Sequence, residues 1–202
     1  MSKPKVFGIG FQKTGTSSLG RALEILGYRV SGYWEFRDFA QEPSLTMDQV
    51  IERAHALVGE FDAFKDTPWP VLYRELDTAY PGSKFIHVVR DTQSWINSAT
   101  RDFGSHPNRM RRLIYGCDYP VGNEQIWIDR YEAHNKEVVE YFKDRPDDFI
   151  TLHLNKGEVG FEPACKFLGL PVPDASWPLV NKIGNKKRRM LMARVFKKIK
   201  GK

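Results

Sequence analysis

The glycine-rich stretch GIGFQKTGTSSLG, residues 8–20, constrains the fold more than any other feature of the sequence. It overlaps a short apolar run, residues 6–9, with the β-branched and aromatic content of a strand. After it, apolar side chains recur at helical spacing on one face: Leu19, Ala22, Leu23 and Leu26. Gly27 then follows as a C-terminal stop signal. A strand that passes through a glycine-rich loop into a helix predicts the first unit of a parallel α/β sheet.

The rest of the chain continues this alternation. Apolar runs typical of strands span residues 61–65, 84–89 and 148–154. Helical patterns span residues 47–58, 71–79, 94–100, 124–142 and 163–168, with Asp91 or Thr92 as the expected cap at 94–100. This order predicts an α/β fold with a three-layer, P-loop-type parallel β-sheet flanked by helices, in which ligands bind at the carboxyl ends of the strands. Segments 101–122 and 171–186, rich in Pro, Gly, Asn and Arg, are expected to be loops.

We expect one domain over residues 1–202, because a chain of 202 residues with 41% hydrophobic content can bury one sizeable core. The formal charge of +6 comes from a basic C-terminal tail, residues 186–202, since residues 182–202 hold 10 Lys or Arg and no Asp or Glu. Residues 1–181 carry 21 basic and 25 acidic side chains, a net charge of −4. The tail is interpreted either as a solvated helix or as a basic amphipathic helix on an anionic membrane surface.

Composition also excludes several classes of protein. A neutral-to-acidic body does not suit an extended nucleic-acid groove, which needs a basic face with stacking aromatics. The two cysteines, Cys117 and Cys165, are too few for a disulfide framework, and no His or Cys cluster has zinc-ligand spacing. No stretch has the length of a membrane span or the pattern of a secretory signal. We therefore expect a cytoplasmic protein without a metal site and without a nucleic-acid partner.

The glycine-rich loop has the features of an anion site. Backbone N–H groups at a helix N-terminus favour phosphate or sulfate, and four hydroxyls add donors: Thr14, Thr16, Ser17 and Ser18. Gly10 and Gly15 have the spacing of a nucleotide-triphosphatase loop. In such a loop a lysine follows the second glycine, whereas here Thr16 stands there and the lysine is Lys13.

The segment FQKTGTSSL resembles the 5′-phosphosulfate loop of the sulfotransferases that use 3′-phosphoadenosine 5′-phosphosulfate (PAPS), in which the lysine precedes the second glycine. The resemblance implies that Lys13 contacts the oxygen that bridges phosphate and sulfuryl group. It also implies that the loop backbone and hydroxyls hold the 5′-phosphate, without a metal ion. The implied loop residues are Gln12, Lys13, Thr14, Gly15, Thr16, Ser17 and Ser18.

A second motif resembles the same family. In VVRDTQSWINS, Arg90 ends a predicted strand and Ser98 follows eight residues later on the next helix, the arrangement that binds the donor's 3′-phosphate in that family. An arginine fork suits a dianionic phosphate. GFEPACKFLGLPVPDASWPLVN is similar to the closing segment of the short RTGTTSL-type subgroup, so the resemblance covers roughly residues 5–185. Ser18 stands where hormone-type members place an adenine-stacking aromatic, which leaves the stacking residue open.

The acceptor hydroxyl needs a base, and the segment FDAFKDTPW suggests one. Asp66 matches the aspartate that the short subgroup uses in this role, while Thr67 aligns nearest to the histidine of hormone-type members. Lys65 is expected to stabilise the transferring group. His153, at the end of a predicted strand, is the alternative base.

The resemblance implies transfer of a sulfuryl group from PAPS to a hydroxyl of a small molecule, sugar or lipid. The alternative is a P-loop kinase or nucleotide-triphosphatase that uses ATP and magnesium, which Gly10, Gly15 and Ser17 partly support. A third class is a non-catalytic binder of nucleic acid or anionic membranes through the tail. Three arginines, Arg109, Arg111 and Arg112, are either available for an anionic acceptor or simply solvated. The sequence does not determine the acceptor or the oligomeric state.

Overall fold

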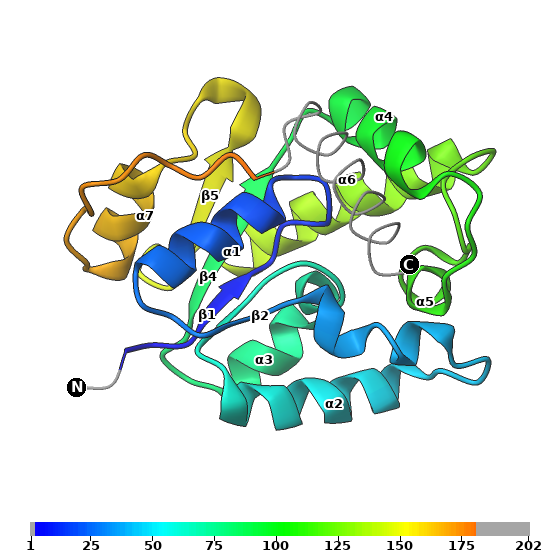
Figure 1. Ribbon diagram of the computed structural model, residues 1–202, viewed down its shortest axis with the longest axis horizontal. Coiled ribbons are helices and arrows are strands. Elements are labelled where there is room, and N and C mark those ends of the chain that lie inside the picture. Colours follow the sequence, from blue (N-terminus) through cyan, green and yellow to red (C-terminus); the bar gives the residue numbers. More distant parts are fainter. Residues whose placement is uncertain (1–2, 181–202) are drawn as a thin grey trace, which may run out of the picture.

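The computed structural model describes residues 3–180, and within them one five-stranded parallel sheet forms the centre of the molecule (Figure 1). The strands are β1 (Val6–Gly8), β2 (Val30–Ser31), β3 (Ala63–Phe64), β4 (Lys84–Val89) and β5 (Phe149–His153). They lie in the order β2-β3-β1-β4-β5, and every pairing is parallel. The predicted α/β class with a parallel sheet is confirmed. Because β1 lies in the middle, the loop that follows it has β3 on one side and β4 on the other.

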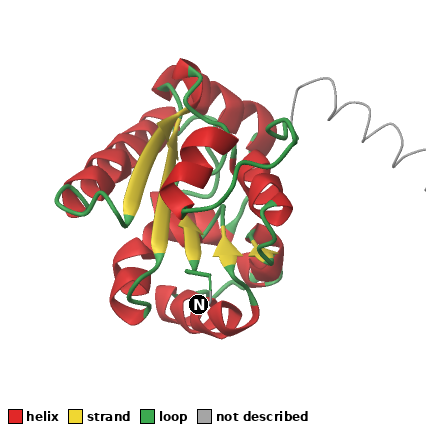
Figure 2. Ribbon diagram, turned by 90° about the vertical axis from the view of Figure 1, so that its left-hand side faces the viewer, coloured by secondary structure: helices red, strands yellow, loops and turns green. Residues whose placement is uncertain are grey.

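Helices cover both faces of the sheet (Figure 2). The helices are α1 (Thr16–Ile25), α2 (Met47–Glu60), α3 (Tyr73–Ala79), α4 (Thr92–Phe103), α5 (Arg109–Tyr115), α6 (Glu124–Tyr141) and α7 (Phe161–Leu168). Four short 3₁₀ turns connect them in the described chain: η1 (Tyr33–Phe36), η2 (Phe39–Gln41), η3 (Trp69–Leu72) and η4 (Leu154–Lys156).

The alternation of side chains along the strands divides the core into two layers. Val6, Ile86 and Leu152 point to one face, where they pack with leucines of α1 and α7: Leu19, Leu23 and Leu168. Phe7, Phe64 and Phe85 point to the other face and pack with the side chains of α2 to α6. The Phe7 ring stacks on Phe64 at 4.8 Å and on Phe85 at 5.4 Å between ring centroids. Aromatic packing therefore holds the three central strands together, and the glycine-rich loop emerges from the middle one, β1.

Two predicted helix ends are confirmed by their capping geometry. The carboxylate of Asp91 accepts a hydrogen bond from the backbone N–H of Ser94 at 2.9 Å and so caps α4. Gly27 follows α1 with φ of +80°, a left-handed conformation that glycine adopts without strain.

The prediction of a loop over residues 101–122 is wrong in part, because α4 continues to Phe103 and the segment holds α5. Asn108 caps α5 by accepting from the backbone N–H of Arg111 at 3.0 Å, and Met110 and Ile114 are buried. The strand β2 was not predicted, since two residues carry no periodicity. Residues 171–180 form no helix or strand, as expected, whereas residues 181–186 and the tail, 186–202, lie outside the described residues.

Two histidines are buried in the core without charge. His87 on β4 and His134 on α6 are both 0% exposed. His87 Nε2 lies 2.9 Å from the Asn135 side-chain oxygen, and His134 Nε2 lies 2.8 Å from the carbonyl of Ile9. Because oxygen can only accept in these contacts, each Nε2 carries the proton. Desolvation by burial lowers the pKa of His87 from 6.5 to about 4 and that of His134 from 6.5 to about 3.

These histidines predict acid instability. A histidine with a depressed pKa in the folded state stabilises the protein above its unfolded pKa, and this stability is lost as the pH falls below about 6.5. Between about pH 7 and about pH 5 each histidine is expected to remove about 2 kcal/mol of unfolding free energy. Urea titrations at the two pH values measure this loss. A His134→Gln variant, which cannot titrate there, is expected to lose less, and equal unfolding free energies for the wild type at both pH values would contradict the prediction.

Candidate active site

The loop after β1 is held close to the sheet at Gly10. A Cβ atom at Gly10 would lie 2.2 Å from the carbonyl oxygen of Val88 on β4, so that only glycine fits. Gly15, at the start of α1, has φ of +109°. The loop therefore turns from the end of β1 into α1 through two positions where glycine is required, and the Gly15 carbonyl accepts from the N–H groups of Ser18 and Leu19 at 2.9 and 3.0 Å in the first turn of α1.

The Lys13 side chain points to α4 and pairs with the carboxylate of Asp102. Its ammonium also lies 5.9 Å from the centroid of the Phe103 ring. The side chain is only 18% exposed, and the backbone of Lys13 is left-handed, with φ of +73°. A lysine in this conformation is uncommon, because its Cβ approaches the neighbouring carbonyl oxygen. The loop thus holds the Lys13 ammonium at a half-buried position beside α4.

Gln12 connects the loop to three other elements. Its side-chain oxygen accepts from the hydroxyl of Thr67 at 2.9 Å, and its side-chain nitrogen donates to the hydroxyl of Tyr115. The indole N–H of Trp95 donates to the Gln12 carbonyl at 2.8 Å. Gln12 is 5% exposed, so both ends of its amide are used inside the protein. These contacts make the loop rigid on the side of α4 and α5.

The loop hydroxyls point in different directions. The Thr14 hydroxyl donates to the Phe11 carbonyl at 2.7 Å and is buried within the loop. The Thr16 hydroxyl donates to the Asp66 carboxylate at 3.1 Å. The Ser18 hydroxyl accepts from the backbone N–H of Val180 at 3.3 Å. Ser17 lines a cavity beside α1.

Arg90 reaches the loop from the end of β4. Its guanidinium donates to the carbonyl of Lys13 at 3.2 Å. Tyr131 on α6 fixes its backbone: the Arg90 N–H donates to the tyrosine hydroxyl at 2.9 Å, and that hydroxyl donates to the Arg90 carbonyl at 2.7 Å. Ser98 is 4% exposed and accepts from the Arg101 guanidinium at 3.4 Å. The structure brings Arg90 to the loop and gives no direct contact between Arg90 and Ser98 in the described residues.

One face of α4 faces the loop. Trp95, Ser98 and Asp102 are spaced at i, i+3 and i+7, so they share this face. Trp95 contacts Gln12 and Asp102 contacts Lys13, which puts Ser98 between two contacts to the loop. Sequence reasoning missed Trp95 and Asp102, although the helical spacing from Ser98 was a signal for both.

Asp66 follows β3, on the other side of β1 from Arg90. One carboxylate oxygen accepts from the Thr16 hydroxyl, and the other accepts from the backbone N–H of Thr67 at 2.8 Å. Its backbone is left-handed, with φ of +70°. Within the described residues, Lys13 and Asp66 are the non-glycine residues with positive φ. Strained backbone of this kind concentrates at functional sites, and here both residues belong to the predicted catalytic set.

His153 lies at the end of β5, and the order of strands separates it from Asp66. The ends of β3 and β5 are three strand spacings apart, roughly 14 Å. The backbone N–H of His153 donates to the Glu158 carboxylate at 3.0 Å. Asp66, which contacts the loop directly, is therefore the better candidate for the base.

The arginines of α5 have separate environments. Arg112 pairs with Asp118 at the surface. Arg111 is partly buried, with its guanidinium carbon 4.2 Å from the centroid of the Phe103 ring, and burial lowers its pKa from the ordinary arginine value. Since Lys13 contacts the same ring, Arg111 adds positive charge near the Lys13 end of the loop.

Residues 3–180 contain no group of three or more His, Cys, Asp or Glu side chains placed to hold a metal ion. In the same residues, no helix has the length and apolar character needed to cross a membrane.

Comparison with known proteins gives consistent matches. The family model described as a sulfotransferase domain matches residues 5–125 and 99–185. A relative from Aspergillus versicolor, the Ava biosynthesis cluster protein M, is 26% identical over 215 residues, with 86% of this chain and 79% of that protein covered. The crystal structure of a sulfotransferase from Alicyclobacillus acidocaldarius superposes with a TM-score of 0.51 at 18% identity, covering 96% of this chain and 91% of that one. At this identity the structural likeness concerns the fold alone.

Proposed function

We propose that this chain, which belongs to the sulfotransferase family, transfers the sulfuryl group of PAPS to a hydroxyl of a small molecule, sugar or lipid and releases 3′,5′-adenosine bisphosphate. Membership of the family makes the chain a transferase of sulfuryl groups. The donor, the acceptor class and the residue roles are the parts that we infer.

The proposed donor site lies where the loop and β4 meet. The N–H groups of the loop and of the first turn of α1 hold the 5′-phosphate, together with the hydroxyls of Thr16 and Ser17. Arg90 and Ser98 bind the 3′-phosphate. The contact between the Arg90 guanidinium and the Lys13 carbonyl supports this assignment, because it keeps a phosphate-binding cation within reach of the loop.

The proposed reaction is an in-line displacement. The acceptor oxygen attacks sulfur, the bond from sulfur to the bridging phosphate oxygen breaks, and the acceptor proton passes to the Asp66 carboxylate. Lys13 stabilises the negative charge that develops on the bridging oxygen, and Lys65 adds positive charge on the acceptor side. For this, the Lys13 ammonium leaves Asp102 and turns to the donor.

The contact between Thr16 and Asp66 carries the proposal. At 3.1 Å it joins a residue of the anion-binding loop to Asp66, the acidic side chain that follows β3 in the FDAFKDTPW segment. A base one hydrogen bond away from the loop is within reach of an acceptor that attacks a group bound there.

Calorimetric titration of the full chain with 3′,5′-adenosine bisphosphate, AMP and ATP with magnesium tests the proposed donor. We expect the bisphosphate to bind at least about 10-fold more tightly than AMP, because the 3′-phosphate adds charge-assisted hydrogen bonds. Tighter binding of ATP with magnesium would replace this proposal with the kinase or nucleotide-triphosphatase alternative.

The Arg90→Ala variant tests the 3′-phosphate site directly. Loss of one bidentate guanidinium is expected to weaken binding of the bisphosphate by about 10-fold to 100-fold and to change AMP binding far less. Arg29→Ala is the control, because Arg29 pairs with Asp62 before β2 and β3, at the opposite ends of the strands from the loop. An equal loss for both nucleotides in Arg90→Ala would show that Arg90 shapes the loop and does not recognise the 3′-phosphate.

The cellular setting is also part of the proposal. Cys117 and Cys165 are free thiols, which suits the reducing cytoplasm. The basic tail, residues 186–202, lies outside the described residues, and we propose it as a peripheral contact to anionic membranes, with no nucleic-acid partner. Sedimentation of the full chain with anionic and neutral vesicles distinguishes this role from a solvated tail.

A further inference from the structure

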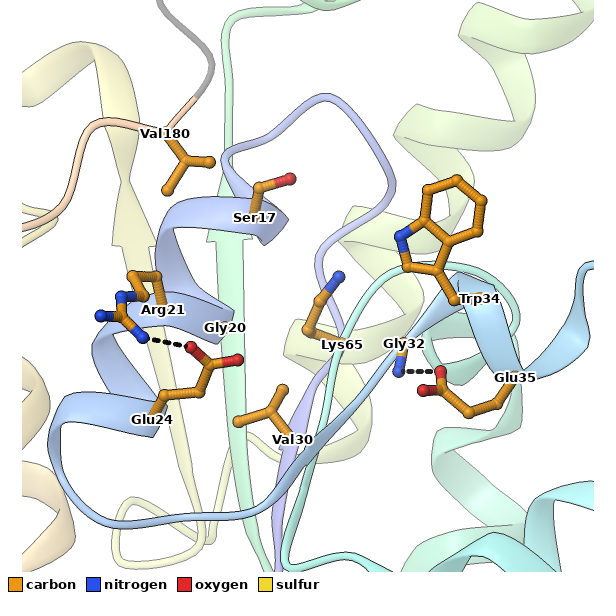
Figure 3. A pocket seen from close by; sticks show the side chains of 10 residues that line it. All are labelled: Ser17, Gly20, Arg21, Glu24, Val30, Gly32, Trp34, Glu35, Lys65 and Val180. Carbon is orange, nitrogen blue, oxygen red and sulfur yellow. Dashed lines mark hydrogen bonds and ion pairs between the residues drawn. The ribbon is translucent and has the colours of Figure 1, made fainter. Parts of the chain in front are cut away.

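A cavity of about 290 Å³ lies beside α1, on the side of β2 and β3 (Figure 3). Its lining includes Ser17, Arg21, Glu24, Trp34, Glu35 and Lys65. Arg90 and Ser98 come after β4 in the chain, and β4 lies on the opposite side of β1 from β2 and β3. The cavity is therefore separate from the proposed 3′-phosphate site, and it shares Ser17 with the loop.

Lys65 lies in the middle of this cavity, between α1 and the segment of Gly32 and Trp34 (Figure 3). Three glycines make room for it. A Cβ at Gly32 would lie 2.7 Å from the Lys65 ammonium, one at Gly20 would lie 3.0 Å from its Cε, and one at Gly8 would lie 3.3 Å from its Cβ. Glycine inside a helix is destabilising relative to alanine, and Gly20 is inside α1. The groove that receives the lysine therefore depends on small residues from three separate segments.

The Lys65 ammonium has no carboxylate partner among the described residues. The carboxylates of the cavity are engaged elsewhere: Glu24 pairs with Arg21 at 2.8 Å, and Glu35 accepts from the backbone N–H of Gly32 at 2.8 Å. The lining thus holds two cations and two carboxylates, and among the described residues Lys65 is the cation of the lining without an ion pair, in a partly buried place where a charge contact is worth more than at an open surface.

Trp34 provides an aromatic surface at the same cavity. It is 71% exposed, although indole rings are usually well buried. The Tyr33 ring lies 6.3 Å from the indole between centroids, and the Arg37 guanidinium lies 5.7 Å from the centroid of the indole. An exposed indole beside a free ammonium suits a planar ring that carries a negative charge.

We propose that this cavity binds the acceptor, and that the acceptor is a planar, aromatic hydroxyl compound with a carboxylate group. The Lys65 ammonium binds the carboxylate, the Trp34 indole packs on the ring, and the hydroxyl points to Asp66, which directly follows Lys65. The inference rests on the proposed function and specifies its substrate class.

The test compares hydroxylated aromatic acids with their methyl esters, which keep the ring and the hydroxyl and lose the charge. The probes are 4-hydroxybenzoate, 4-hydroxyphenylacetate and 3-(4-hydroxyphenyl)propionate, measured as sulfuryl acceptors with PAPS and as ligands in the presence of the bisphosphate. We expect at least one acid to exceed its ester by about 10-fold in kcat/KM. Lys65→Met, which keeps the aliphatic stem in the groove, is expected to abolish this preference. Lys143→Met, at a surface lysine that pairs with Glu140, is the control and is expected to keep it.

A second pair of variants tests the groove without changing a charge. Gly32 has φ of −158°, so alanine is not strained there, and a Cβ at residue 32 would lie 2.7 Å from the Lys65 ammonium, 2.9 Å from its Cε and 3.3 Å from the Lys65 carbonyl oxygen. Gly32→Ala is expected to reduce the preference for acids at least about 3-fold, whereas Gly59→Ala, where a Cβ meets nothing within 4 Å, is expected to leave it unchanged.

Three results would overturn the proposal: esters used or bound as well as acids, no binding of any probe, or an equal loss of kcat on acids and esters in Lys65→Met. The last result would assign Lys65 to the transferring group. Calorimetry with the bisphosphate separates this proposal from the proposed function, because a chain that binds the bisphosphate and ignores the acids refutes the acceptor class alone.

Discussion

Lys13→Met is expected to reduce the rate of sulfuryl transfer at saturating PAPS by about 100-fold to 1000-fold. Removing one preorganised donor from a developing anion has an effect of this size, because the charge it stabilises exists mainly in the transition state. Methionine keeps an unbranched side chain and so adds no new restriction at the left-handed position of residue 13. Single-turnover measurements with preformed PAPS complex give the rate of the chemical step.

The control for this prediction is Lys166→Met, at an exposed lysine of α7, which is expected to keep full activity. Affinity for the bisphosphate is expected to fall less than the rate in Lys13→Met, since the backbone of the loop and Arg90 still hold the phosphates. If affinity falls while the single-turnover rate at saturating PAPS stays unchanged, Lys13 contributes uniform binding and not stabilisation of the transition state.

The ion pair between Lys13 and Asp102 determines when the lysine ammonium is available to another anion. The Lys13 ammonium is neutralised by the Asp102 carboxylate, which is itself only 16% exposed. Breaking a partly buried ion pair leaves a charge uncompensated, so the lysine leaves Asp102 only when another anion takes its place. In the proposed reaction the donor supplies that anion.

The sequence predicted the parts of the site that depend on local order. One such part is the glycine loop between a strand and a helix, which depends on residues that are neighbours in the chain. Another is the arginine at the end of β4, which the parallel sheet expected from alternating strands and helices brings to the same edge. Thr16 and Asp66 were placed in the donor and acceptor roles separately. Their contact follows from the pairing of β1 with β3, which no local pattern encodes.

Other features depend on segments that are far apart in the chain. The left-handed backbone at Lys13 and Asp66 has no signal in residue type, because lysine does not favour that region. The groove for Lys65 requires Gly8, Gly20 and Gly32 to meet one side chain. Gly8 ends β1, Gly20 lies inside α1 and Gly32 follows β2, so the groove becomes evident only when the three segments are in place.

Asp66→Asn is expected to reduce kcat by about 100-fold to 10,000-fold while the affinity for the bisphosphate changes less than about 2-fold. The substitution is conservative in structure. Asparagine is one of the few non-glycine residues that tolerate the left-handed backbone, here φ of +70°, and its side-chain oxygen still accepts from the Thr67 N–H or the Thr16 hydroxyl. Only the ability to take a proton is lost.

The matched control is Asp62→Asn, four residues earlier, where the carboxylate pairs with Arg29 at the other end of β3. It is expected to lower stability slightly and to leave turnover unchanged, since a surface ion pair contributes at most about 1 kcal/mol. An Asp66→Asn enzyme that retains a tenth or more of wild-type kcat would rule out the carboxylate as the base. His153 lies three strands away and cannot replace it, so the acceptor would then lose its proton without help from either side chain. In that case acceptors with a lower hydroxyl pKa would be the faster substrates.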